Sequence, residues 1–342
     1  MRKYIFFAVF ATYSSKKCRY STSHIVISCI FKFRTSCVRL LCNLFYLEKL
    51  NACFAFFLDL HYLCQSEIHV SMKRTKVWYC LVVIGLLVSC TIQRERCEGS
   101  GYILTFSDEF DGADGSRPDP TKWRSSQRQS STWNRWIKDS IAVAYIDKGN
   151  LVLKAIPNTD RTVDKAAMLT GAVETRGLYS FKHGKVEVRA KTYAYTGNFP
   201  AIWMMPQSAK EGWPACGEID IFETIDTQNT TYHTVHSHWT YNVGRQSEPR
   251  SSHSAQFPMD DYHVYGFEWE EDVMRWYVDG IQVGSYSRSK DPEAIAQGQW
   301  PFEKEFYLIL NQSVGNGSWA APADTMHTYR MDVDWVRVYQ KK

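Results

Sequence analysis

Three carboxylates lie close together between residues 218 and 223, in the order E-x-D-x-x-E. Successive side chains of a β-strand point to opposite faces, so Glu218 and Asp220 share one face, whereas Glu223 would point to the other. A β-bulge between Asp220 and Glu223 adds one residue and returns Glu223 to the face of the other two. The sequence therefore predicts a bulged strand with three carboxylates on one side and apolar side chains on the other.

Carboxylates that share a face repel one another, which raises the pKa of one group and keeps it protonated while another stays ionised. On a bulged strand the Cα atoms of Glu218 and Glu223 would lie about 13 Å apart. Side chains that lean together would bring their carboxyl groups to about 5 Å, the separation of a retaining glycosidase. Asp220 is too short for either catalytic role and is expected to hydrogen-bond Glu218. The alternative is a solvated acidic strand face without a catalytic role.

Short strands and turn residues surround this cluster from about residue 100 onward. The segment 185–191 alternates charged and apolar residues, which predicts a strand with one buried face. The dipeptide Asp279-Gly280 separates the segments 274–278 and 281–283 and predicts a tight hairpin. Because no long segment shows helical spacing of apolar residues, we expect an all-β sandwich of antiparallel strands in one domain, 101–342.

The segment Gly217–Glu223 resembles the signature of glycoside hydrolase family 16 in its bulged form, which occurs in laminarinase-like β-glucanases, agarases and carrageenases. The resemblance implies a β-jelly-roll (concanavalin A-like) sandwich of two antiparallel sheets with a concave substrate cleft. It also implies that Glu218 is the nucleophile, Asp220 its supporting carboxylate and Glu223 the general acid/base, without a cofactor for catalysis. Other stretches agree with the family in the same order, at 106–110, 184–191, 199–204, 265–269, 308–311 and 334–339.

Aromatic and imidazole side chains near the acidic strand are candidates for substrate binding. Thr234, His236 and His238 alternate and should face one way on the next strand. The resemblance implies a histidine beside the acid/base; we favour His236 over His238, with a half-buried structural histidine as the alternative. Trp203 and Trp213 are expected to stack on pyranose rings, although most tryptophans of a sandwich lie in the core.

Four further candidates lie in loops or turns, and the segment 133–136 falls where family members have a cleft-edge loop. Asn134 and Trp136 are expected to bind distal sugars. Arg176 and Asn198 are expected to donate hydrogen bonds near the cleft, with surface solvation as the alternative. The segment 311–317 departs from the apolar, double-glycine version typical of laminarinases, so the resemblance does not extend to fine specificity.

The resemblance also implies a structural Ca²⁺ on the convex side, held by backbone carbonyls and one aspartate near the last strand. Asp334 and Gly149 match those places, and Glu109 is a further candidate. Oxygen ligands suit Ca²⁺. The alternative is an ordinary solvated aspartate on a terminal strand.

The first hundred residues differ in composition from the rest. Residues 1–71 contain no Gly, Pro or Trp and carry six of the ten Cys, so we interpret them as a non-native upstream extension. A genuine cysteine-rich extension is the alternative. Residues 72–89 resemble a bacterial lipoprotein signal peptide, with Cys90 as the lipidated residue and 90–100 as a tether. This predicts a lipid-anchored protein of the bacterial cell envelope; the alternatives are a short apolar anchor or a chance Cys after an ordinary signal peptide.

Residues 91–342 hold 28 Lys and Arg against 33 Asp and Glu, a net charge of −5, which argues against nucleic acid as a partner. We expect a monomeric, retaining endo-β-glucanase that hydrolyses β-1,3 or mixed-linkage β-1,3/1,4-glucan. One alternative is an agarase- or carrageenase-type galactan hydrolase, with positive charge supplied by Arg135, Lys138, Arg176 and Arg245. The other is a non-catalytic carbohydrate-binding protein, which the three intact carboxylates disfavour.

Overall fold

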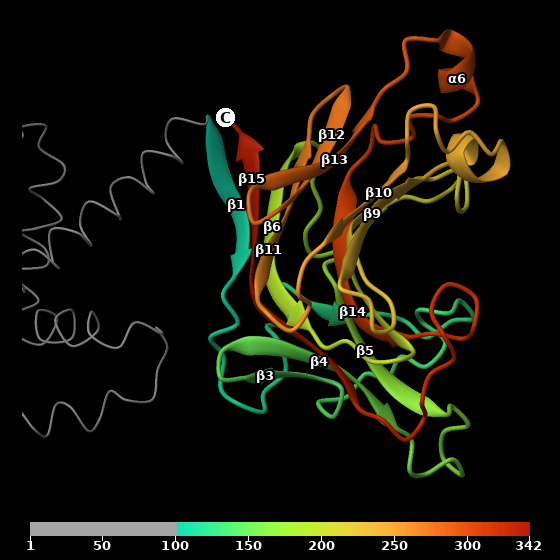
Figure 1. Cartoon of the computed structure of the whole chain (residues 1–342). Coiled ribbons are helices and arrows are strands. Elements are labelled where there is room, and N and C mark those ends of the chain that lie inside the picture. The colour runs from blue at the N-terminus through green and yellow to red at the C-terminus, as the bar shows by residue number, and fades with distance from the viewer. Residues whose placement is uncertain (1–100) are drawn as a thin grey trace, which may run out of the picture. The chain divides into compact units, whose positions relative to one another are not determined.

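The computed structural model describes residues 101–342. The predictions for the N-terminal extension, the signal peptide 72–89, Cys90 and the tether 90–100 therefore lie outside the described residues. Gly101–Lys342 forms a compact unit of its own, and almost all of its regular structure is β-strand, as the alternating patterns predict (Figure 1).

Fifteen strands and two short helical turns make up the regular structure of residues 101–342. The first eight strands are β1 (Tyr102–Asp108), β2 (Arg124–Ser125), β3 (Ala144–Asp147), β4 (Asn150–Pro157), β5 (Met168–Glu174), β6 (Gly184–Thr192), β7 (Asn198–Pro206) and β8 (Glu218–Glu223). The others are β9 (Thr230–His236), β10 (Ser252–Gln256), β11 (His263–Trp269), β12 (Val273–Val278), β13 (Ile281–Ser287), β14 (Phe306–Val314) and β15 (Tyr329–Lys341). The helical turns are η1 (His238–Asn242), of π type, and α6 (Pro292–Ala296). Within the described part of the chain, no helix has the length and apolar character needed to cross a membrane.

The strands pair in the order β10-β9-β8-β7-β14-β5-β4-β15-β6-β11-β12-β13, with β1 beside β15, β2 beside β5 and β3 beside β4. All of these strand pairs are antiparallel. The strands from β10 to β5 form one layer and those from β4 to β13 the other (Figure 1). The predicted jelly-roll sandwich is confirmed, with one refinement: its two sheets are joined by hydrogen bonding between β4 and β5.

The core lies between the two layers and follows from the two-residue period of the strands. In β6, every second side chain is buried, from Gly184 to Thr192. Trp269 on β11 and Trp276 on β12 are 1 % and 0 % exposed and pack in this core. Each large apolar side chain that is fully buried contributes about 1.5–3 kcal/mol, so the layers are held together mainly by this interior.

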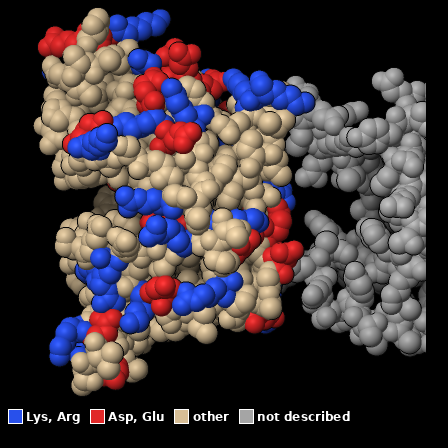
Figure 2. Space-filling model, turned by 180° about the vertical axis from the view of Figure 1, so that it is seen from behind, with Lys and Arg blue, Asp and Glu red and all other residues tan. Residues whose placement is uncertain are grey.

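The predicted hairpin at Asp279-Gly280 is confirmed and joins β12 to β13. Both residues have positive φ, 51° and 80°, which is the left-handed conformation that two-residue turns between twisted strands require. On the outside of the molecule, basic and acidic side chains lie among one another over the face in Figure 2. Arg128 and Asp164 form one of the ion pairs at the protein surface.

Candidate active site

The bulge predicted from the carboxylate spacing is present in β8. Against β9, Asp220 pairs with Thr234 and Glu223 pairs with Tyr232, so three steps along β8 match two along β9. The pairing with β7 skips Ile221. The side chain of Ile221 packs in the core with 0 % exposure, while Glu223 faces the other way. The extra residue therefore restores the shared face of the three carboxylates.

A glycine fixes the start of this strand. Gly217 has a φ of +87°, and a Cβ atom there would lie 3.0 Å from Cγ of Pro301 and 3.1 Å from Cε1 of Phe302. A Cβ atom would therefore be crowded by these two rings, and the positive φ would strain any other residue, so glycine is strongly favoured at this position. The chain therefore turns tightly at Gly217, and Glu218 enters β8 as its first residue.

A cleft of about 1030 Å³ opens over the face of β7, β8, β9 and β14 that points away from the core. Glu218, Asp220 and Glu223 line its floor, together with His236. Aromatic side chains from several loops and strands form much of the rest of its lining: Trp133, Phe199, Trp203, Tyr241 and Trp319. The connection between β9 and β10, residues 237–251 with η1 in it, supplies seven of the 22 residues that line the cleft. Such a mixture of carboxylates and flat apolar surfaces suits a sugar chain.

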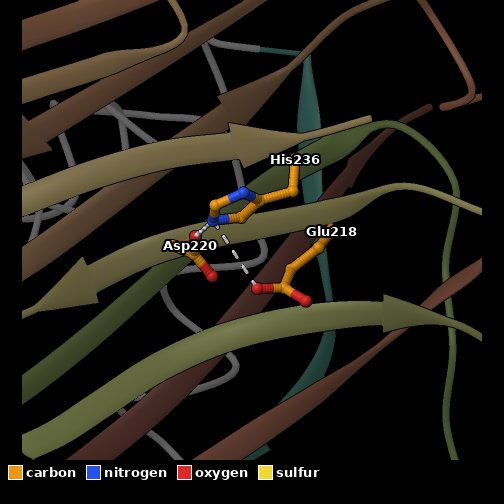
Figure 3. Close-up of side chains that lie close together, drawn as sticks. All are labelled: Glu218, Asp220 and His236. Carbon is orange, nitrogen blue, oxygen red and sulfur yellow. Dashed lines mark ion pairs between the residues drawn. The ribbon is translucent and has the colours of Figure 1, made fainter. Parts of the chain in front are cut away.

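His236 faces the acidic cluster from the neighbouring strand (Figure 3). Its Nε2 atom lies 3.3 Å from Oδ2 of Asp220 and 3.8 Å from Oε1 of Glu218. Burial by itself lowers the pKa of His236, but the interaction with Asp220 and the charges of the glutamates outweigh it and raise the pKa to about 10. His236 is therefore a cation at neutral pH and favours one ionised carboxylate beside it.

The two glutamates have different surroundings. Burial, followed by the charge of Asp220, raises the pKa of Glu218 to about 8, although Trp213 and His236 act against the rise. The indole Nε1 of Trp213 donates a hydrogen bond of 2.8 Å to Oε2 of Glu218. Burial and the charge of Asp220 also raise the pKa of Glu223 well above its usual value. Within residues 101–342 no side chain hydrogen-bonds the Glu223 carboxylate, so Glu218 is the glutamate better suited to be ionised and Glu223 the one better suited to hold a proton.

These shifts predict a pH profile displaced upward. If Glu218 acts ionised and Glu223 protonated, kcat/KM rises with pH as Glu218 loses its proton and falls as Glu223 loses its own. Because both pKa values are raised, both limbs of the bell should lie above pH 4.5. Initial rates measured on a soluble substrate across pH 4–10 check this. Full activity at pH 4 would contradict the expected ionisation states.

Trp213 and Trp203, both predicted to stack on sugars, lie at the site. Trp213 is 48 % exposed and borders the cleft through its hydrogen bond to Glu218 and its edge contact with Tyr241, whose ring centre is 4.7 Å away. Trp203 lines the cleft but is 6 % exposed. Its Nε1 donates to Oδ1 of Asn311 at 2.7 Å, and its ring meets that of Trp133 edge-on at 4.7 Å. Trp203 therefore supports Trp133 as much as it lines the cleft.

The other predicted substrate-binding residues do not line the cleft. Asn134 and Asn198 are 2 % and 1 % exposed; Asn198 instead hydrogen-bonds Thr192 and Gln312 inside the protein. Neither residue is among those that line the cleft, so their contact with sugar stays a prediction that this placement does not support.

Three more candidates lie apart from the lining for other reasons. Trp136 packs against a small cluster around Tyr329, under the guanidinium of Arg135. Arg176 lies over the ring of Tyr307, with 5.7 Å between its Cζ atom and the ring centre. His238 leaves the alternation of β9 because η1 begins there, and its Nδ1 contacts the Gln297 carbonyl at 3.2 Å.

The predicted calcium ligands do not make an oxygen-rich set. Asp334 pairs with Arg189 at 2.5 Å, and Glu109 forms two bonds with Arg337, at 2.9 and 3.0 Å. Gly149 lies in the turn between β3 and β4. An arginine against each carboxylate fits Ca²⁺ poorly, so the calcium site stays a prediction without support from this geometry.

Among the described residues, the one group of three potential metal-ligating side chains with ligand atoms within 4.8 Å is Glu218, Asp220 and His236. The raised pKa of His236 makes its ring a hydrogen-bond donor at neutral pH. This protonation state opposes metal ligation, which needs a neutral imidazole.

Comparison with known proteins supports the assignment made from the geometry. The family model described as "Glycosyl hydrolases family 16" matches residues 135–337. The chain belongs to this family. It is therefore a glycoside hydrolase, and the resemblance read from the E-x-D-x-x-E segment is confirmed.

Two curated relatives and one solved structure illustrate the range of this family-16 hydrolase's neighbours. Keratan-sulfate endo-1,4-beta-galactosidase of Sphingobacterium multivorum is 39 % identical over 244 residues, which cover 70 % of this chain and 55 % of that protein. Beta-glucanase of Rhodothermus marinus is 33 % identical over 275 residues, covering 75 % and 93 %. The X-ray structure of the laminarinase from Rhodothermus marinus matches with a TM-score of 0.61 at 28 % identity, covering 70 % of this chain and 97 % of that one.

Proposed function

We propose that the protein is a retaining endo-β-glucanase that cleaves β-1,3 or mixed-linkage β-1,3/1,4-glucan by double displacement. Glu218 attacks the anomeric carbon and forms a covalent glycosyl-enzyme, while Glu223 gives its proton to the departing glycosidic oxygen. Glu223 then removes a proton from a water molecule, which attacks the same carbon and releases Glu218. Asp220 and His236 adjust the charge beside Glu218.

The observation that carries this proposal is the unequal environment of two glutamates on one strand face. Glu218 accepts a hydrogen bond from Trp213 and lies 3.8 Å from the cationic His236, whereas Glu223 has neither contact. An ionised nucleophile and a protonated acid need this inequality. The aromatic lining favours the flat faces of a neutral glucan, and the similarity to the Rhodothermus beta-glucanase supports the same substrate.

The test is hydrolysis of a polysaccharide panel by the purified protein, followed through reducing ends and product sizes. Laminarin and barley-type mixed-linkage glucan should give oligosaccharides of several sizes early in the reaction, as an endo-acting enzyme does. Agarose, carrageenan and keratan sulfate complete the panel. Release from none of them would favour the carbohydrate-binding alternative.

A second candidate substrate is a sulfated β-galactan. The keratan-sulfate endo-1,4-beta-galactosidase has the highest identity of the relatives reported above. Arg250 is the one Lys or Arg side chain that lines the cleft within residues 101–342. Its Nε donates to the Ser252 carbonyl at 2.8 Å, and no carboxylate of the described chain pairs with it. Such a guanidinium is suited to a sulfate ester.

The four cations considered from the sequence do not serve this purpose. Arg135 and Arg176 lie on aromatic rings, Lys138 lies 4.0 Å from Asp164, and Arg245 pairs with Glu248. None of them lines the cleft. A sulfated substrate would therefore depend on Arg250.

Replacing Arg250 by Gln should separate the two substrates. If the enzyme takes sulfated galactan, KM for that chain should rise about 10-fold, the value of one charged contact of about 1.4 kcal/mol, while kcat/KM on laminarin stays unchanged. Arg250→Lys, which keeps the charge, is the matched control. Equal kinetics of the wild type and Arg250→Gln on keratan sulfate would rule out a contact with sulfate.

The lipid anchor at Cys90, the location at the bacterial cell envelope and the monomeric state rest on sequence alone and stay predictions. We propose them together with the activity, because an envelope-bound hydrolase would meet polysaccharide outside the cytoplasm.

A further inference from the structure

The bulge in β8 leaves backbone groups outside the regular ladder, and buried groups of this kind need other partners. Two carbonyls at the bulge find them in side chains. The Ile221 carbonyl accepts a hydrogen bond of 2.7 Å from Nδ1 of His233, and the Asp220 carbonyl accepts one of 2.9 Å from Nε1 of Trp276. Both donors are 0 % exposed.

The two donors reach the bulge from different sides. His233 belongs to β9, which pairs with β8, and Trp276 belongs to β12 in the opposite layer. On β9, His233 faces the interior, whereas Tyr232 and Thr234 on either side of it are half-buried on the cleft face. The bulge is therefore held from its partner strand and from across the core.

The hydrogen bonds of His233 define its proton position. A carbonyl only accepts, so Nδ1 carries the hydrogen toward Ile221, and Nε2 lies 2.9 Å from the hydroxyl oxygen Oγ1 of Thr231, which also lies 3.3 Å from the Ala255 carbonyl. Burial lowers the pKa of His233 to about 4. The ring is therefore neutral at neutral pH and keeps one fixed donor.

We propose that His233 is a positioning residue for Glu223. Its bond to the Ile221 carbonyl fixes the place of the extra residue, and the place of the extra residue decides whether Glu223 points into the cleft. The proposal rests on the proposed role of Glu223 as general acid/base. It gives the two histidines of β9 separate duties: His236 supplies charge in the cleft, and His233 holds the backbone beneath it.

The physical reason is the coupling between backbone register and side-chain direction. Without the imidazole donor, the Ile221 carbonyl would be buried and unpaired, which is costly. The strand can relieve this by moving the bulge along β8, because a one-residue shift exchanges the faces of the residues that it passes. Misplacement of a reacting group by about 1 Å lowers a rate by about 100-fold.

Amide side chains provide matched variants. In His233→Asn the amide nitrogen takes the place of Nδ1 and keeps the donor, whereas in His233→Gln it takes the place of Nε2 and loses it. His233→Leu has no donor. We expect kcat on the polysaccharide to fall about 100-fold in the Gln and Leu variants, and to stay within about 3-fold of wild type in His233→Asn.

The readout specific to a misplaced acid is its dependence on the leaving group. The dinitrophenolate of a 2,4-dinitrophenyl glycoside departs without protonation. The rate of its burst release should therefore stay within about 3-fold of wild type in all variants. Azide should accelerate turnover of the Gln and Leu variants, because it attacks the glycosyl-enzyme without a general base. Melting temperatures show whether each variant is folded.

Two results would overturn the proposal. The first is a folded His233→Gln variant whose rate falls equally on polysaccharide and on the dinitrophenyl glycoside, or whose kcat on polysaccharide does not fall at all. The second is a His233→Asn variant whose kcat on polysaccharide falls as far as that of His233→Gln. Glu223→Gln, measured alongside, separates the acid/base role of Glu223 from the positioning role of His233. If Glu223→Gln shows no leaving-group dependence, the acid/base assignment fails as well. If it does and His233→Gln does not, the positioning proposal alone fails.

Discussion

Replacing Glu218 by Gln is expected to lower kcat on the preferred polysaccharide by about 10⁴-fold or more, because an amide cannot attack the anomeric carbon. Gln keeps the size of the side chain and an oxygen that can accept the hydrogen bond from Trp213. The cleft should therefore keep its shape, and binding of oligosaccharide should persist. Reducing-end assays and calorimetric titration with the same sugar check both parts.

The stability of this variant gives an independent control. The pKa of Glu218 is raised to about 8 in the folded protein, so the folded state binds its proton more tightly than the unfolded chain does. This contribution to stability is complete below about pH 4.5 and is lost as pH rises to 8. Glu218→Gln should therefore lose less stability than wild type over that range, as measured by urea unfolding. A parallel pH dependence of the two proteins would contradict the raised pKa.

The nucleophile can also be identified by the product of rescue. In Glu218→Gly, azide can enter the space left by the carboxylate and attack a glycoside with a good leaving group. The product should be the α-glycosyl azide, with inverted configuration, since only one displacement takes place. A β-glycosyl azide would assign the nucleophile to another residue.

Replacing Glu223 by Ala is expected to lower kcat on polysaccharide by about 10³- to 10⁴-fold, because the leaving oxygen departs without a proton and water attacks without a base. The loss should shrink for a 2,4-dinitrophenyl glycoside, which needs no acid. Steady-state and burst kinetics on the two substrates measure this difference.

Azide distinguishes Glu223 from Glu218. With Glu223→Ala the covalent intermediate still forms on Glu218, and azide attacks it from the opposite side to give the β-glycosyl azide, with retention. An α product, or the same loss on both substrates, would reverse or remove the roles proposed here. Glu223→Ala also removes a buried carboxyl group whose ionised form is unfavourable in the folded protein, because burial raises its pKa. The variant is therefore expected to be no less stable than wild type at pH 8.

The centre of the site was predictable because its residues conflict with a regular strand. Glu218, Asp220 and Glu223 cannot share a face without one extra residue, and the register of β8 shows that residue at Ile221. The hairpin at Asp279-Gly280 was predictable for a similar reason, because few dipeptides tolerate two positive φ angles. Local backbone geometry is encoded by short patterns, and short patterns were sufficient here.

The walls of the cleft were not predictable in the same way. Arg250 and Trp319 come from loops, where side-chain direction follows no fixed period, and Tyr241 comes from the short helical turn η1, which the alternating pattern does not predict. In one loop, Trp133 lines the cleft and its neighbour Asn134 is buried. From the sequence alone, Asn134 and not Trp133 is a candidate for sugar binding.

Two histidines lie where the sequence pattern did not indicate, for local reasons. His238 leaves the alternation of β9 because Ser237 caps η1, which begins at His238. His233 went unnoticed because it faces the core, and a pattern of alternate residues gives no sign of a side chain that binds a backbone carbonyl.

The connection 237–251 carries residues that would contact the substrate, and it is a different element from the strand that carries the carboxylates. The carboxylates proposed to react lie on β8, inside a layer between β9 and β7, whereas Tyr241 and Arg250 lie on the connection between the adjoining strands β9 and β10. Loops of this kind tolerate insertion and replacement far better than strands do. Exchange of this one connection would offer a route, in evolution or in the laboratory, to new polysaccharides with the chemistry inherited unchanged.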